Sequence, residues 1–281
     1  MTAALRYEWR RLASLRSTWW ITVGSVVAGA GFTFFVAMVL RLSSGSELHG
    51  SVSEGESRFF LDAAMTQFSN VDPMFYLLAY AVAILGILSW GHEYRHGMIR
   101  ATLTAVPNRS MIWGAKYLVI AAWVAAVVVV SCVASLIFTL IWFSGLDLEY
   151  DFGALAIAIF KRIVYSVLLS WLVMSVTVLI RHQTFSLVLL YLWPLGIETM
   201  LKLVFQIFSS VSGNDDLYDI ARLLPFNAGG RIMQNWGTGG LQENLDLFGD
   251  PLSAFGGFII FGGFTLILMV GSLVAFQKRD A

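Results

Sequence analysis

Charged residues are scarce in this sequence. Asp, Glu, Lys and Arg make up 13% of its 281 residues, whereas soluble domains carry roughly 25%. Hydrophobic residues account for 58% of the chain, and the mean hydropathy is +0.74. This composition predicts an integral membrane protein with no separate soluble domain. The formal net charge is zero, which argues against a nucleic-acid partner.

Cysteine and phosphate-binding loops are also lacking. The single cysteine, Cys132, lies in the apolar run 117–143, so an intramolecular disulfide is excluded and a cysteine-based metal site is disfavoured. No Gly-x-x-x-x-Gly-Lys-Ser/Thr motif occurs, and this motif is the signature of P-loop ATPases. If ATP drives this protein, we expect the hydrolysis to take place in another polypeptide.

Long apolar runs are abundant instead. A transmembrane helix needs about 20 predominantly apolar residues, and six stretches qualify or nearly qualify. We predict an all-α membrane protein whose six spans form a single domain over residues 1–281. The expected spans are 18–40, 73–90, 111–143, 163–180, 184–208 and 252–276. A further apolar piece, 152–160, is separated from the fourth span by Lys161 and Arg162, which we expect to mark the outer interface.

The distribution of basic residues predicts the orientation. An even number of spans places both termini on one side, and that side carries eleven of the eighteen basic residues but three of the eighteen acidic ones. Because cytoplasmic segments are enriched in Lys and Arg, we expect both termini in the cytoplasm. At the N-terminus, Leu5, Trp9 and Leu12 share one helical stripe within 3–17, which predicts an amphipathic helix at the membrane interface; an unstructured basic tail is the alternative.

Ionisable residues inside the fifth span are candidates for a substrate path or gate. Glu198 and Lys202 lie four residues apart on one helix face, so pairing with each other is the competing, structural interpretation. Pro194 precedes them and removes one helical hydrogen bond, which can kink the span. The following segment, 209–251, combines Gly and Pro with apolar residues and predicts either short re-entrant helices or a plain external loop.

A charged segment at 91–109 interrupts the apolar runs. It begins with His92-Glu93-Tyr94-Arg95-His96, the H-E-x-x-H pattern of zinc hydrolases, in which two histidines bind zinc and the glutamate acts as general base. A third ligand would have to come from His182, which we expect on the same membrane face. The segment carries cations that keep it at the interface, so we regard a zinc hydrolase as an alternative only.

The same segment has the features of a docking site for a cytoplasmic partner. Gly97 can end the helix that extends from the second span, Met98 to Ala105 can form a short helix, and Ser110 can cap the third span. A short helix lying across the ends of two spans would transmit a force exerted by such a partner and tilt both spans.

The stretch from Gly91 to Arg109 resembles a motif of the permease subunits of ABC-2 type exporters. The matching pattern is Gly-x-Glu-Tyr-Arg-x-Gly-x-Ile-Arg-x-x-Leu-x-x-x-Pro-x-Arg, and the six spans and the N-terminal helix are also similar. The resemblance implies that 91–109 carries the helix that couples to a nucleotide-binding subunit, and that 209–251 is re-entrant. The residues it assigns to coupling are Glu93, Tyr94, Arg95, Gly97 and Arg100. The expected short helix adds Met98, Ile99 and Leu103 as contact residues.

The resemblance also implies partners and a location. We expect two ATPase subunits that bind ATP and magnesium, a second permease protomer, identical or homologous, and surrounding lipid, all in a bacterial plasma membrane. The chain itself is expected to be non-catalytic and to hold no cofactor or metal. The cargo is expected to be amphipathic, lipid-like or drug-like. An ion-coupled carrier using Glu198 is a further alternative, which the scarcity of acidic residues at depth disfavours.

Overall fold

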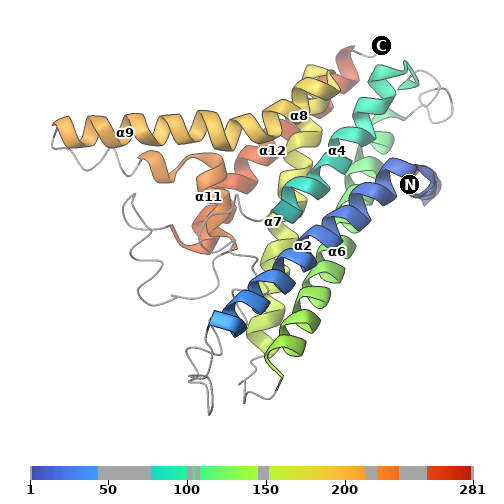
Figure 1. Cartoon of the computed structure of the whole chain (residues 1–281). Helices are drawn as coiled ribbons and strands as arrows, with labels where there is room; N and C mark the ends of the chain where they lie inside the picture. The colour runs from blue at the N-terminus through green and yellow to red at the C-terminus, as the bar shows by residue number, and fades with distance from the viewer. Residues whose placement is uncertain are drawn as a thin grey trace.

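The computed structural model describes residues 2–43, 77–99, 104, 108–144, 152–212, 220–233 and 252–279. Within these ranges the chain is helical, with short turns and no strand, which confirms the predicted all-α class. The helices are α1 (Thr2–Ser14), α2 (Arg16–Ser43), α4 (Leu77–Arg95), α6 (Arg109–Trp142), α7 (Phe152–Ile180), α8 (Gln183–Leu192), η3 (Trp193–Glu198), α9 (Thr199–Ser212), α11 (Pro225–Arg231) and α12 (Ala254–Arg279) (Figure 1).

Five helical segments in the described ranges are long and apolar enough to cross a membrane. They are Arg16–Val39, Arg109–Trp142, Leu155–Ile180, Gln183–Val211 and Ala254–Lys278. The predicted span 73–90 corresponds to α4, which is not among the five. Its described part is 19 residues long and ends in the polar sequence His-Glu-Tyr-Arg.

Helix α7 corrects the predicted boundary of the fourth span. The pieces 152–160 and 163–180 belong to one continuous helix of 29 residues, because the stretch contains no proline and Lys and Arg are good helix formers. Lys161 and Arg162 therefore lie inside the helix, and Arg162 is fully buried rather than at an interface.

Helix α4 lies in the centre of the bundle. It packs against α7, α2, α8 and α6, and Figure 1 shows it between α8 and α2. Gly86 allows the close approach to α7, because a Cβ atom there would lie 2.8 Å from Cγ of Met174 and 3.0 Å from the carbonyl oxygen of Ser170. A movement of α4 would therefore also displace the helices that pack against it.

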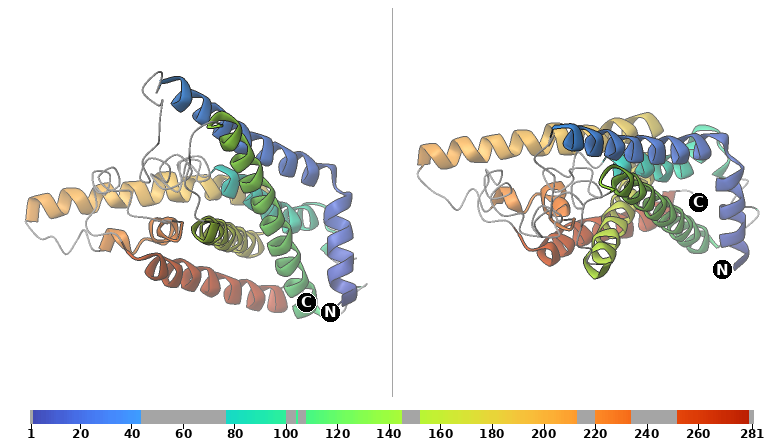
Figure 2. Two further views of the ribbon diagram at one scale, coloured as in Figure 1. Left: turned by 90° about the horizontal axis from the view of Figure 1, so that it is seen from below. Right: turned by 60° about the horizontal axis from the view of Figure 1, so that its bottom comes forward.

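The fifth predicted span is irregular. Helix α8 passes through one π-helical turn, η3, into α9, and Thr199 donates a hydrogen bond to the carbonyl oxygen of Pro194 at 3.1 Å. Such turns arise where the regular ladder is disrupted, and Pro194 lacks the amide that the ladder needs. Figures 1 and 2 show α9 extending away from the rest of the bundle.

Candidate functional site: a buried ion cluster at the end of α4

Helix α1 carries two charged side chains into the bundle. Its buried residues are Ala4, Glu8 and Leu12, which follow one another at helical spacing of four. Of the predicted apolar stripe, Leu12 is buried, Leu5 is half-buried, and Trp9 is 43% exposed and packs on Trp123. The buried face directs the Glu8 carboxylate toward Lys116 of α6.

Four charged groups from three helices meet at this point. Nζ of Lys116 lies 2.7 Å from Oε1 of Glu93 and donates a hydrogen bond to Oε2 of Glu8 at 3.0 Å. Nη1 of Arg11 contacts both carboxylates, Glu8 at 3.2 Å and Glu93 at a shorter distance. Nη2 of Arg11 donates to the carbonyl oxygen of Ser89 at 3.0 Å. Two carboxylates and two cations make the cluster electrically neutral.

Burial makes each member of the ion cluster dependent on the others. Glu93 is 0% exposed, Lys116 1% and Glu8 6%, so an unpaired charge left there would carry a large desolvation penalty. Nζ of Lys116 also lies 5.2 Å from the centroid of the Trp90 ring, within the range of a cation–π contact. The cluster therefore holds α1, α4 and α6 in one register.

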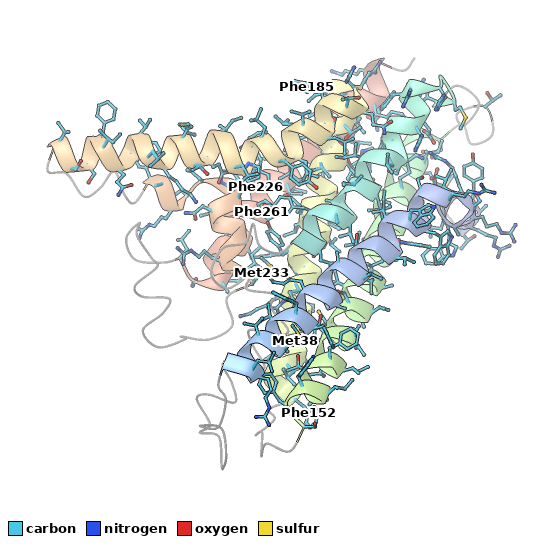
Figure 3. The ribbon with its side chains drawn as sticks, in the orientation of Figure 1. Met38, Phe152, Phe185, Phe226, Met233 and Phe261 are labelled. Carbon is cyan, nitrogen blue, oxygen red and sulfur yellow. The ribbon has the colours of Figure 1, made fainter. Side chains whose placement is uncertain are left out.

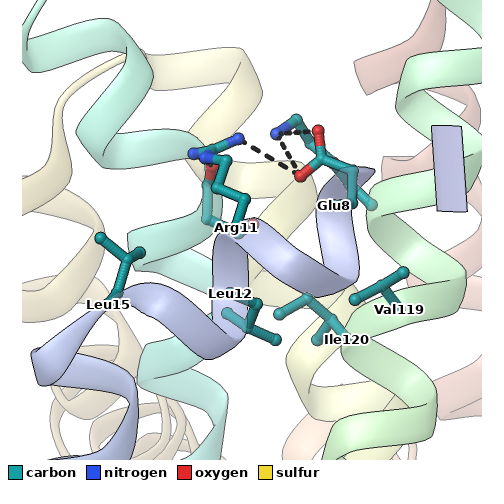
Figure 4. Close-up of a pocket in the computed structure, with 8 residues that line it drawn as sticks. Glu8, Arg11, Leu12, Leu15, Val119 and Ile120 are labelled. Atoms are coloured by element: carbon teal, nitrogen blue, oxygen red, sulfur yellow. Dashed lines mark hydrogen bonds and ion pairs between the residues drawn. The ribbon is translucent and has the colours of Figure 1, made fainter. Parts of the chain in front are cut away.

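A small pocket opens beside the cluster. Figure 4 shows Glu8 and Arg11 directed toward the cluster, while the apolar side chains of α1 and α6 lie on the other side. The pocket is lined by Glu8, Arg11, Leu12, Leu15, Ser89, Lys116, Val119 and Ile120.

Helix α4 ends at Arg95, two residues after Glu93, as the sequence predicts from Gly97. Gly97 has a positive φ of 63°, and the amide of Met98 donates to the carbonyl oxygen of Glu93 at 3.0 Å. This is the bond of a Schellman cap, which favours glycine in the left-handed position. The residues from Arg95 to Met98 are exposed. A buried anchor and an exposed turn are thus adjacent in the chain.

The predicted coupling residues divide between these two environments. Glu93 is buried, Tyr94 and Ile99 are half-buried, and Met98 is 46% exposed. Arg100 and Leu103, and most of the short helix expected at 98–105, lie outside the described residues. Helix α6, the predicted third span, is capped by Asn108, whose side chain accepts from the amide of Met111. The expected cap, Ser110, lies inside the first turn because the helix begins one residue before it.

The turn between α7 and α8 packs against the same end of α4. It is as short as predicted, with Arg181 at a φ of 59° and His182 as the cap of α8. The guanidinium of Arg181 lies 5.7 Å from the Tyr94 ring. A Cβ on Gly91 would come within 2.8 Å of the Gln183 side chain, so the turn and α4 are in close contact.

The two histidines of the H-E-x-x-H pattern lie side by side on α4 and the following turn. The His92 and His96 rings are stacked with centroids 6.1 Å apart. Nδ1 of His182 is already engaged, because it accepts a hydrogen bond from the amide of Phe185 at 3.2 Å. Among the described residues no group of three or more His, Cys, Asp or Glu side chains could hold a metal ion. No observation in the described ranges favours a zinc site.

In the predicted fifth span, Glu198 interacts electrostatically with Lys202 and has a further neighbour in α11. The Glu198 carboxylate accepts hydrogen bonds from the amides of Phe226 at 2.9 Å and Asn227 at 3.0 Å, the first free amides of α11 after Pro225. Glu198 thus caps a helix in the predicted re-entrant region, while Lys202 is only half-buried one turn away. Figure 3 shows Phe226 next to Phe261, and their ring centroids are 5.8 Å apart.

Sequence reasoning did not find three members of the ion cluster. Glu8, Arg11 and Lys116 were counted only as charges of the inner side. Two local signals were available: Glu8 shares the Ala4–Leu12 face, and Lys116 lies within the apolar run 111–143. The chain matches no protein-family model, and it matches no curated protein.

Proposed function

We propose that this chain is the membrane-spanning permease subunit of an ATP-driven exporter of the ABC-2 type. In this proposal α4 is the second of six spans, α1 lies at the cytoplasmic interface, 209–251 is re-entrant, and both termini are in the cytoplasm of a bacterium. Two protomers form the path, and separate ATPase subunits supply the energy. The cargo is an amphipathic or lipid-like compound, because the spans are predominantly apolar.

One observation supports the proposal best. The exposed turn from Arg95 to Met98, which we call the docking turn, begins two residues after Glu93, which is fully buried and ion-paired to α1 and α6. A partner that displaces the turn would therefore move three helices together. In this mechanism Glu93 is a positioning residue, whereas Arg95 and Met98 are the groups that touch the ATPase.

The proposal predicts an ATPase that depends on the exposed turn. The tagged chain, purified from its native membrane in mild detergent, is expected to retain magnesium-dependent ATP hydrolysis. Met98→Asp should abolish this activity by placing a charge in an apolar contact, while the permease stays folded. Lys278→Ala, which removes an exposed cation from the end of α12, is the matched control and should leave the activity unchanged.

Two outcomes would contradict the proposal. One is ATP-independent transport by the lone chain in sealed vesicles. The other is ATPase activity that survives Met98→Asp and Arg95→Ala together, because the two side chains proposed to touch the ATPase would then be dispensable.

A further inference from the structure

Arg162 is a fully buried cation in the outer half of α7, by the predicted orientation. It lies ten residues after the first residue of the helix, or about 15 Å along its axis, and it is 0% exposed. It shares the buried face of the helix with Tyr165, Ser166 and Leu169. A charge at such a depth is costly unless it is paired, and is therefore a candidate for a functional role.

The other fully buried cation shows how this chain compensates such a charge. Lys116 contacts two carboxylates, those of Glu8 and Glu93. Arg162 makes one hydrogen bond, from Nη1 to the carbonyl oxygen of Ala158 in its own helix, at 3.0 Å. Within the described ranges, neither Nε nor Nη2 has a hydrogen-bond partner, and Arg162 forms no ion pair with an acidic residue.

The geometry of the vacant donors is specific. Nε and Nη2 form one edge of the planar guanidinium, and this edge binds two oxygens of a carboxylate or phosphate in parallel. The bond from Nη1 to Ala158 fixes the plane, and the Nε–Nη2 edge is buried without a hydrogen-bond partner in the described part of the chain. Ser166 lies one turn further on the same face, and its buried hydroxyl also lacks a partner in the described part of the chain. Other buried hydroxyls of α7, such as Ser170 and Thr177, bond to the carbonyl four residues earlier.

We propose that Arg162, assisted by Ser166, binds a phosphate or carboxylate group of an anionic amphiphile between the helices of the bundle. Arg162 interacts electrostatically with Cys132 of α6, so α6 is one of the helices near the site. The site does not depend on the export function, since an anionic lipid bound there would stabilise the permease whether or not it is the cargo.

Thermal unfolding of the purified chain in neutral detergent tests the site. Phosphatidylglycerol is expected to raise the melting temperature by several degrees, whereas phosphatidylcholine with the same acyl chains should have little effect. Arg162→Gln should remove the response, and Arg162→Lys should reduce it, because an ammonium group keeps the charge but loses the two-pronged edge. Lys161→Gln, which removes the neighbouring half-buried cation, is the matched control and should respond like the natural chain.

The same unfolding measurement with inorganic phosphate in place of lipid identifies the source of the anion. Stabilisation by phosphate alone that is lost in Arg162→Gln would support the site and assign it to a small free anion. If phosphatidylglycerol stabilises Arg162→Gln as much as the natural chain, lipid binding is independent of Arg162 and the proposal is wrong. Absence of any response to phosphatidylglycerol and phosphate in the natural chain would also overturn it.

If Arg162→Gln does not fold, native mass spectrometry of Arg162→Lys decides. The natural chain and Lys161→Gln are expected to retain one phosphatidylglycerol molecule under conditions that strip it from Arg162→Lys. Equal retention in all three would exclude recognition by the guanidinium edge.

Discussion

At the scale of single residues, the ion cluster makes Lys116 a sensitive position. Lys116→Met removes one cation and leaves Glu8 and Glu93 with only Arg11 as a partner. Breaking a buried ion pair in this way costs about 3–5 kcal/mol. We expect a loss of that order in the free energy of unfolding, measured in mixed detergent. The double variant Lys116→Met/Glu93→Gln restores neutrality and should recover most of the loss; additive effects of the two substitutions would contradict the cluster.

His92 gives a second prediction at this scale. Its pKa is lowered, first because the ring is partly buried and then because His96, Arg11 and Arg95 are nearby. The unfolded chain therefore takes up a proton at a higher pH than the folded chain does. Stability from this group is present above about pH 6.5, the ordinary value, and is lost as the pH falls below it.

Unfolding measured across this pH range should show the effect as a difference between variants. His92→Gln is expected to flatten the decline below pH 6.5. His96→Gln removes only the second cause, so it should retain most of the decline. A decline in His92→Gln equal to that of the natural chain would show that other groups control the acid sensitivity.

The ion cluster shows what residue-level reasoning from sequence can and cannot reach. Glu93 was predicted to matter because it lies in a recognisable motif. Its partners Arg11 and Lys116 are 82 and 23 residues away in the chain, and only the packing of three helices brings them together. Trp9 was assigned to the apolar stripe of the N-terminal helix by residue type, whereas the face that packs into the bundle carries Glu8, whose charge Lys116 compensates.

At the scale of elements, the helix ends were more predictable than the spans' interiors. The Gly97 stop and the turn at 181–183 depend on local backbone preferences, so the sequence suffices. The continuity of α7 through Lys161 and Arg162 was missed, because hydropathy penalises charges that a helix tolerates once they are enclosed by neighbours. The capping of α11 by Glu198 joins segments 28 residues apart. Local sequence patterns therefore could not predict it.

The anchoring of α11 can be tested by hydrogen exchange. Glu198→Gln removes the charge from both hydrogen bonds to the amides of Phe226 and Asn227. Hydrogen bonds to charged groups contribute about 1.5–3 kcal/mol, so exchange of these amides should accelerate by roughly tenfold or more. Lys202→Gln, one turn away on the same helix, keeps the cap and is expected to leave exchange unchanged. If the Phe226 and Asn227 amides of the Glu198→Gln variant exchanged as slowly as those of the natural chain, packing of α11 on α12 alone would hold the helix.

At the scale of the whole molecule, the bundle converges at the end where α4 stops. The chain termini lie toward this end (Figures 1 and 2), and Arg109 at the start of α6 donates to the carbonyl oxygen of Gln277 near the end of α12 at 3.0 Å. Six crossings would place the N-terminus, the docking turn and the C-terminus on one face of the membrane. Five helices satisfy the length and apolarity required, so the membrane crossing of α4 remains a prediction.

Cysteine labelling of intact bacterial cells that express the protein tests this topology. In a Cys132→Ala background, single cysteines at Thr2, Met98 and Lys278, which are all exposed, should resist a membrane-impermeant maleimide until the cells are permeabilised. A cysteine at Ser53, in the loop 41–72 that the sequence predicts to be external, should react at once. If α4 did not cross the membrane, Ser53 and Met98 would lie on the same side of it. The two positions would then label alike, and the docking turn could not meet a cytoplasmic ATPase unless Ser53 were also inside.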